Sequence, residues 1–425
     1  MVDFSKSSSK FFDDKHQYNL FNYGHVGKYD IATERGYTTR NVDGNEYFEQ
    51  EAIPEPVLVT FTASETNPEL ASITSQYYEI FKDNPEGRYE DLLQIQLGNA
   101  LRNGDAPGSV YSIWSNIGTP YNAFGKSEND QFRVTGSGSV NIGDHSLSLG
   151  FEFEQRTDRG WSSGDNGPIS LWTMARQLAN GHLSELDKNQ VITFNRGTHT
   201  YIAYEVLNSG DAYINGDGNH GGFNDEQSFF DYNLRKEVFG DAANSSFLNI
   251  DALDPNIMKF DMFTPDELFN SGSSYVSYYG YDHTGKKVRG KTDIDNYFTD
   301  LDDNGNYVRK VGAFQPIYVS GYLMDKFAFR DIVFNVGVRV DVFDANQPVL
   351  KDKYLLYEAN SVNEANDLVA KDGAKYSWVK IPESMGDDYV VYVNDVNNPT
   401  AINGFRNGDT WFDANGAEVE DARVL

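Results

Sequence analysis

The sequence predicts an all-β fold: an antiparallel transmembrane β-barrel segment with long loops and a few short helices. Two runs of alternating apolar and polar residues, near 131–156 and 317–343, predict hairpins. Their strands are longer than soluble sheets need, which points to a membrane wall. A composition rich in Tyr, Phe and Gly favours β-structure with many turns.

Residues 131–156 form the clearer hairpin. A two-residue turn at Gly143-Asp144 places glycine first, as a type II′ turn requires. This turn pairs Val140 with Leu147, Gly138 with Leu149, Gly136 with Phe151 and Val134 with Phe153. All apolar residues then share one face, and large side chains stand opposite glycines.

Residues 317–343 repeat the design around a turn at Arg330-Asp331. The predicted apolar pairs are Phe329/Ile332, Phe327/Phe334, Leu323/Val338, Gly321/Val340 and Val319/Val342. Asp325 does not fit, because this register sets it opposite Val336 on the apolar face. At about 3.3 Å per residue and a tilt near 45°, eleven residues rise roughly 25 Å, the height of a barrel's apolar band.

The sequence patterns that predict the other elements are less regular. We expect strands at 17–30, 57–63 and 389–393, and helices at 70–81, 89–101 and 169–186, where apolar residues recur at three- and four-residue spacing. Residues 208–245 and those from 341 onward are dense in Asp, Asn and Gly and are expected to be long loops.

Charge and composition exclude several classes of function. The chain has 35 basic and 64 acidic residues and a net charge of −29, which argues against nucleic acid as a partner. It has no Cys, so disulfides, thiolate nucleophiles and Cys-ligated zinc are excluded. The first fifteen residues hold no apolar core of a signal peptide, and no apolar run is long enough for a membrane-spanning helix.

Short motifs suggest chemistry only weakly. Residues 160–164 match the G-x-S-x-G pattern of hydrolases, but the preceding strand alternates and no helix follows directly. Residues 300–306 match the first half of a calcium loop, with Val311 in place of the final Glu. An Asn-Gly turn is the preferred interpretation, and calcium stays an alternative. We expect no catalytic residue, no metal site and no cofactor.

Three longer stretches, 131–161, 171–187 and 296–358, together with 60–81, resemble TonB-dependent outer-membrane receptors of Bacteroidetes type. The resemblance implies a large barrel in the bacterial outer membrane, whose full-length form holds a plug domain and takes up substrates with energy from TonB. We recognise no plug-like or TonB-contacting segment before residue 17 and no aromatic strand in the last residues given. The chain is therefore expected to be an incomplete, internal part of a barrel over residues 1–425, with large extracellular loops, that does not transport alone.

On this hypothesis lipid of the outer membrane contacts the apolar faces, and polar side chains face the lumen. The residues expected to face lumen and substrate are Arg133, Glu152, Tyr322, Lys326, Arg339 and Asp341. The alternative is a secreted β-sandwich that binds or hydrolyses carbohydrate, with aromatic rings stacking on sugars. A calcium-stabilised surface adhesin is a third possibility.

Overall fold

The computed structural model describes residues 1–81, 89–184, 186–206, 227–290, 292–347, 349–355, 359–396 and 398–424. It is strand-rich but mixed, with 39% strand and 22% helix in several antiparallel sheets. The prediction of an antiparallel strand-rich fold is confirmed, although the helical share is larger than an all-β chain would have. The single domain expected over 1–425 is seen as two compact units, Met1–Gln347 and Pro348–Leu425, which are described separately.

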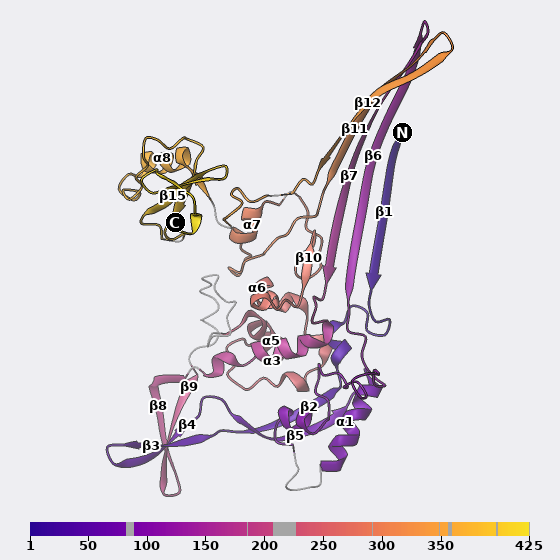
Figure 1. Cartoon of the computed structure of the whole chain (residues 1–425). Helices are drawn as coiled ribbons and strands as arrows, with labels where there is room; N and C mark the ends of the chain where they lie inside the picture. The colour runs from indigo at the N-terminus through magenta and orange to yellow at the C-terminus, as the bar shows by residue number, and fades with distance from the viewer. Residues whose placement is uncertain are drawn as a thin grey trace. The chain divides into compact units, whose positions relative to one another are not determined.

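A long antiparallel sheet dominates the first unit (Figure 1). Its order is β1 (Val2–Phe11), β6 (Gly125–Ile142), β7 (His145–Ser162), β11 (Ile317–Phe329) and β12 (Ile332–Asp344), and the short β10 (Ser277–Tyr279) pairs with the end of β7. The sheet is open. β1 and β12 are its outer strands, and the strands in the described ranges close no barrel.

Both hairpins have the predicted register. Val140 pairs with Leu147 and Val134 with Phe153 in one, and Leu323 pairs with Val338 in the other. Gly143 has φ +62°, as the first residue of a type II′ turn requires. The two hairpins also join each other through β7 and β11, so their apolar faces become continuous.

The misfit at Asp325 has a local partner. The carboxylate lies 2.6 Å from Nδ1 of His145, which stands one row further along on the same face. The register prediction was therefore right, and the Asp325 carboxylate has a hydrogen-bond partner across strands β7 and β11.

The alternation gives the long sheet an apolar face and a polar face. The apolar face consists of large side chains that are exposed or half-buried; its exposed members include Phe132, Val140, Leu149, Phe151, Val319, Leu323, Ile332, Val336, Val338 and Val340. Val338, for example, is 62% exposed and Leu149 54%. Among the residues described, no second layer seals this face.

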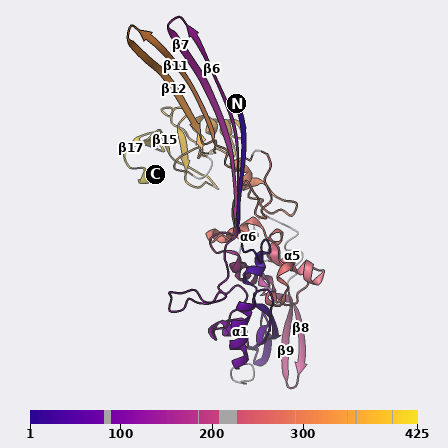
Figure 2. The ribbon, with the colours of Figure 1, turned by 90° about the vertical axis from the view of Figure 1, so that its right-hand side faces the viewer.

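A separate core lies at the end of the long sheet where β6 begins. Trp161 at the end of β7 joins Trp172, Phe230 and Phe263 in this core. Its helices are α3 (Leu171–Leu178), α5 (Phe229–Phe239) and α6 (Pro265–Phe269), with 3-10 turns η1 (Leu20–Gly24), η2 (Pro168–Ser170), η3 (Gly181–Ser184), η4 (Ile250–Ala252), η5 (Pro255–Ile257), η6 (Phe260–Met262) and η7 (Asn270–Gly272). Figure 2 shows these helices gathered beyond the foot of the long strands.

Two smaller sheets complete the first unit. β2 (Gly27–Glu34) pairs with β5 (Glu55–Ala63), and helices α1 (Pro68–Phe81) and α2 (Leu92–Leu97) follow them in sequence. A second sheet has the order β3 (Tyr37–Val42), β4 (Asn45–Gln50), β9 (His199–Val206) and β8 (Leu186–Arg196), with β4 parallel to β9. Helix α7 (Ile294–Thr299) precedes the second long hairpin.

Several predicted elements need correction. The strand expected at 17–30 is a 3-10 turn followed by β2, because Leu20, Phe21 and Tyr23 turn into the core. The helix expected at 169–186 ends at Leu178, where Ala179 is extended and Asn180 has φ +66°. The loop expected at 208–245 contains helix α5, and its residues 208–226 lie outside the described ranges. Helix 70–81 and strand 57–63 are confirmed, whereas helix 89–101 is confirmed only over Leu92–Leu97.

The second unit corrects the prediction of a long loop after residue 341. It folds as a five-stranded sheet of β13 (Asn360–Ser361), β14 (Val390–Val393), β15 (Ile402–Asn407), β16 (Thr410–Asp413) and β17 (Glu418–Val419), with helix α8 (Val362–Lys371) and the turn η8 (Ala422–Val424). Phe405 is fully buried at the centre of its core, beside Val362 and Met385. The strand predicted at 389–393 is β14.

Candidate functional site

The polar face of the long sheet carries all six residues predicted from the sequence. Arg133 on β6 and Glu152 on β7 lie on diagonal rows, and Nη2 of Arg133 is 2.5 Å from Oε1 of Glu152. A second group lies two strands away, where Nε of Arg339 donates to Asp341 at 2.9 Å. Nη2 of Arg339 also reaches Ser320 Oγ at 3.1 Å, and Ser320 pairs with Glu152 in register. The two ion pairs therefore flank one continuous polar strip.

Tyr322 and Lys326 do not join this strip of ion pairs. Tyr322 lies flat over Gly150, where an added Cβ would come 2.5 Å from its ring, so its role there is to cover bare backbone. Lys326 pairs in register with Asn335 and Ser146 and has no ion pair within the described part of the chain. Tyr318 was not among the predicted residues. It donates a hydrogen bond to Asp341 and accepts one from Arg339.

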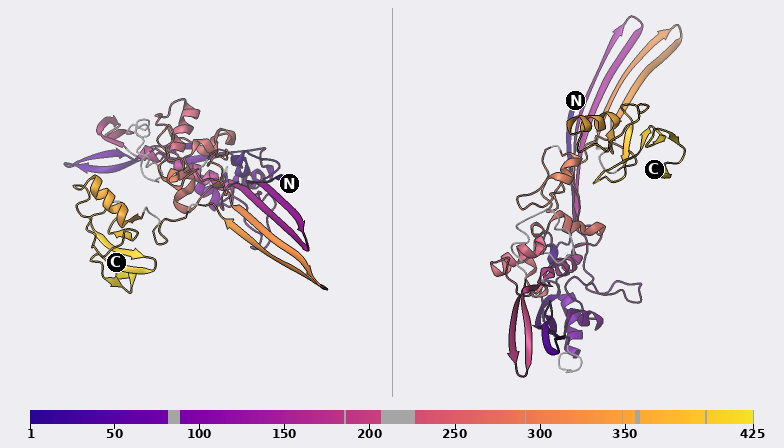
Figure 3. Two further views of the ribbon diagram at one scale, coloured as in Figure 1. Left: turned by 90° about the horizontal axis from the view of Figure 1, so that it is seen from above. Right: turned by 90° about the vertical axis from the view of Figure 1, so that its left-hand side faces the viewer.

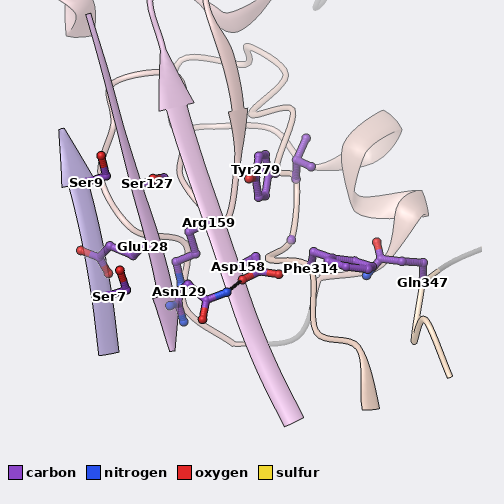
Figure 4. Close-up of a pocket in the computed structure, with 12 residues that line it drawn as sticks. Ser7, Ser9, Ser127, Glu128, Asn129, Asp158, Arg159, Tyr279, Phe314 and Gln347 are labelled. Carbon is purple, nitrogen blue, oxygen red and sulfur yellow. Dashed lines mark hydrogen bonds between the residues drawn. The ribbon is translucent and has the colours of Figure 1, made fainter. Parts of the chain in front are cut away.

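A pocket of about 550 Å³ lies at the foot of the same face (Figure 4). Six parts of the chain that are far apart in sequence line it: Ser7 and Ser9 of β1; Ser127, Glu128 and Asn129 of β6; Asp158 and Arg159 of β7; Tyr279 of β10; Val311, Gly312 and Phe314; and Gln347. Sequence analysis found none of these residues, because no local pattern links the six parts.

Polar side chains make up most of the pocket lining. Serine hydroxyls line one side, and Asn129 donates to Asp158 between β6 and β7. The Tyr279 ring occupies the space that a Cβ on Gly160 would need, 2.7 Å away. The described lining holds neither His nor Cys. The arrangement suits a polar solute that exchanges water for hydroxyl and amide partners.

Charged side chains end the apolar face at the level of this pocket. Asp130 is 3.7 Å from Lys6 and 2.8 Å from Arg159, and Glu128 is 2.5 Å from Lys287. Lys6 and Asp130 lie on the face of Phe132 one row beyond it, and Glu128 and Arg159 lie on the same face two rows beyond it. The apolar side chains thus form a band with a charged border on the side of the helical core.

The G-x-S-x-G stretch is not a nucleophile elbow. Ser162 ends an antiparallel strand and pairs with Gly125 and Ser277, whereas an elbow needs a parallel strand leading into a helix. Trp161 is buried and donates from Nε1 to the carbonyl of His283 at 3.0 Å. Ser163 exchanges hydrogen bonds with the backbone of Phe124.

The acidic stretch 300–306 forms a tight turn in which the carboxylates of Asp300 and Asp302 already have partners. Oδ1 of Asp302 accepts from the backbone N–H groups of Asn304 and Asn306, both at 2.9 Å. The hydrogen bond from Lys310, at 2.8 Å, holds the pKa of Asp300 below its usual range. Asp282 and Asp413 make the same turn, with the same two backbone bonds. The described residues contain no group of three or more His, Asp or Glu placed to hold a metal ion.

Buried polar groups in the helical core serve its architecture. Glu267 accepts from the backbone N–H groups of Thr264 and Phe229, at 2.7 and 2.8 Å, and so joins the starts of α5 and α6. Burial raises the pKa of Glu267 to about 7, although these hydrogen bonds act to lower it. Asp231 and Arg235 form a fully buried pair at 2.7 Å.

Comparisons of the chain with protein-family models, curated proteins and solved structures find no match. No helix in the described ranges is long and apolar enough to cross a membrane.

Proposed function

We propose that this chain is part of the wall of a bacterial outer-membrane β-barrel, belonging to a TonB-dependent receptor that takes up substrates. The apolar face would contact lipid, the polar face would line the lumen, and the helical core with its small sheets would lie outside the bilayer. A plug domain and TonB would act in the full-length receptor. One observation carries the proposal: a long antiparallel sheet leaves a continuous apolar face exposed and a polar face opposite.

The dimensions of the apolar band support this assignment. On β12 the band runs from Ile332 to Val342, at alternate positions. Ten steps of about 3.3 Å along a strand tilted by about 45° rise roughly 23 Å, close to the ~25 Å apolar band of outer-membrane barrels. The charged border of Lys6, Asp130 and Glu128 follows where water would begin.

A secreted β-sandwich fits less well. A sandwich buries the apolar side of each sheet against a second sheet about 10 Å away. Val338 and Val340 are 62% and 60% exposed, and the residues described place no sheet over them. Exposed apolar surface of this extent marks a membrane or partner interface.

Because the chain has no Cys, single cysteines along β12 test the proposal directly. We would introduce Val336→Cys, Val338→Cys and Val340→Cys on the apolar face, and Asn335→Cys, Arg339→Cys and Asp341→Cys on the polar face. Each variant is spin-labelled and reconstituted into lipid vesicles. Labels on the apolar face are expected to collide with membrane-dissolved oxygen, and labels on the polar face with a water-soluble nickel reagent.

Val349→Cys, at an 85% exposed position of the second unit, is the aqueous control. Equal access of the nickel reagent to all six β12 positions would contradict a membrane wall. So would a chain that stays monomeric and folded without detergent or lipid.

A further inference from the structure

Residues 106–124 are a loop without charge in a strongly charged chain. They contain no Asp, Glu, Lys, Arg or His, whereas 23% of the whole chain is Asp, Glu, Lys or Arg. The loop instead carries large apolar side chains that stand in solvent: Tyr111 and Ile117 are each 83% exposed and Trp114 62%. Figure 2 shows this purple segment extending away from the helices beside it, and Figure 3 shows the same in its right-hand view.

The loop is held in place at both ends. Before it, Gly104 donates to the carbonyl of Gly24 at 2.8 Å. After its tip, Asn122 accepts from the backbone N–H of Ile169 at 2.9 Å and donates to the carbonyl of Asn166 at 3.1 Å. The exposed side chains are therefore presented from a fixed base, which lowers the entropy lost on binding.

The backbone at the tip of the loop adopts an unfavourable conformation. Val110 and Trp114 pair through two backbone hydrogen bonds of 2.7 and 3.2 Å. Between them Tyr111 and Ser112 have φ +51° and +57°, a left-handed conformation that disfavours residues other than glycine. Backbone strain at residues other than glycine is common at functional sites. Aromatic side chains are common among the residues that dominate binding energy. A strained tip with exposed aromatic rings is therefore typical of a binding segment.

The acidic side chain beside the loop indicates the charge that the partner should carry. The loop returns over the start of α1, where an added Cβ on Gly118 would lie 2.9 Å from Cβ of Glu69. Glu69 is exposed at this base. An apolar tip above an acidic base matches a cleft with an apolar floor and a basic rim.

Lipid is a poor occupant for this loop. The loop enters β6 at Gly125, and Lys126, Glu128 and Asp130 separate it from Phe132, where the apolar band begins. This exclusion depends on the proposed membrane placement. We infer that residues 110–117 dock into an apolar, basic-rimmed cleft of a second, folded protein, with Trp114 and Ile117 as anchors.

The test has two stages and uses the full chain. A photoreactive phenylalanine analogue is placed at position 111 in cells that naturally make the protein, and the cross-linked adduct is identified by mass spectrometry. The captured protein is then purified and titrated against the chain in detergent. We expect Trp114→Ser to weaken binding by roughly 30-fold or more, the loss typical of a hot-spot residue, and Ile117→Ser to weaken it several-fold.

Leu97→Ser, at a 75% exposed position of α2, is the matched control and should leave the Kd unchanged. Glu69→Gln should reduce the salt dependence of the association rate. An adduct with lipid, an adduct with a second copy, no adduct, or equal Kd values for Trp114→Ser and Leu97→Ser would each overturn the inference. These outcomes are independent of the spin-label result on β12.

Discussion

His182 and His25 are imidazoles buried in the helical core of the first unit. His182 is 3% exposed, and its Nδ1 lies 3.4 Å from Oδ2 of Asp231. His25 stacks on Trp172, with ring centroids 5.7 Å apart. Burial lowers the pKa of each to about 4. Both rings are therefore neutral at pH 7, and protonating either would place a charge inside the core.

This arrangement predicts that the first unit loses stability in mild acid. The unfolded chain binds a proton at each His below about pH 6.5, whereas the folded chain does so only near pH 4. The free energy of unfolding should thus be unaffected above about pH 7 and fall between pH 6.5 and 4. Each His contributes up to ~1.4 kcal/mol per pH unit in that window. Urea titrations in detergent, followed by tryptophan fluorescence, measure the slope.

A variant comparison isolates the contribution of His182. His182→Gln should reduce the acid slope, while His199→Gln, at an exposed position on β9, should not. Glu267 acts in the opposite sense, because its raised pKa favours the folded state at low pH, but it is common to both variants. Identical slopes for the wild type and His182→Gln would refute the assignment of a neutral buried imidazole.

At the scale of elements, the two long hairpins were predictable because each is specified within one short stretch. The alternation fixes the faces and the turn fixes the register, so a one-residue slip would invert every side chain. β1 was not predictable, since Lys6, Ser7, Ser8 and Ser9 show no apolar alternation. Its strand conformation comes from pairing with β6, a partner more than a hundred residues away.

The turns of the two hairpins differ in one residue that we expect to matter. Gly143 and Arg330 hold the same first turn position, with φ +62° and +57°. A left-handed conformation costs a residue with a Cβ about 1–2 kcal/mol. Arg330→Gly removes this cost but gives up the Arg330 stacking on Phe329 and adds unfolded-state entropy. We expect a net gain of roughly 0.5–1 kcal/mol, seen as slower amide exchange in β11 and β12.

Gly143→Ala is the reciprocal variant. It introduces a Cβ into the same conformation and should accelerate exchange in β6 and β7 by a comparable free energy. If Arg330→Gly speeds exchange, or Gly143→Ala slows it, the turn geometry is not what limits hairpin stability.

At the scale of the whole molecule, the candidate site was predictable only in part. Arg133, Glu152, Arg339 and Asp341 could be placed on a polar face, because alternation alone decides the face. The pocket of Ser7, Asn129, Asp158 and Tyr279 could not, since it depends on pairing between β1, β6, β7 and β10. The second unit was missed because its strands have only two to six residues, too short for a clear period.

The division into two units predicts independent unfolding. Phe405 is fully buried in the core of the second unit, so truncating its side chain leaves a cavity there. Phe405→Ala should destabilise that unit by about 3–5 kcal/mol. Hydrogen exchange of the full chain in detergent should then accelerate by roughly two to four orders of magnitude in β14, β15 and β16, while β6 and β7 keep their wild-type rates. Val349→Ala, at an exposed position, should change neither set. Equal acceleration in both units would mean that they fold as one cooperative body.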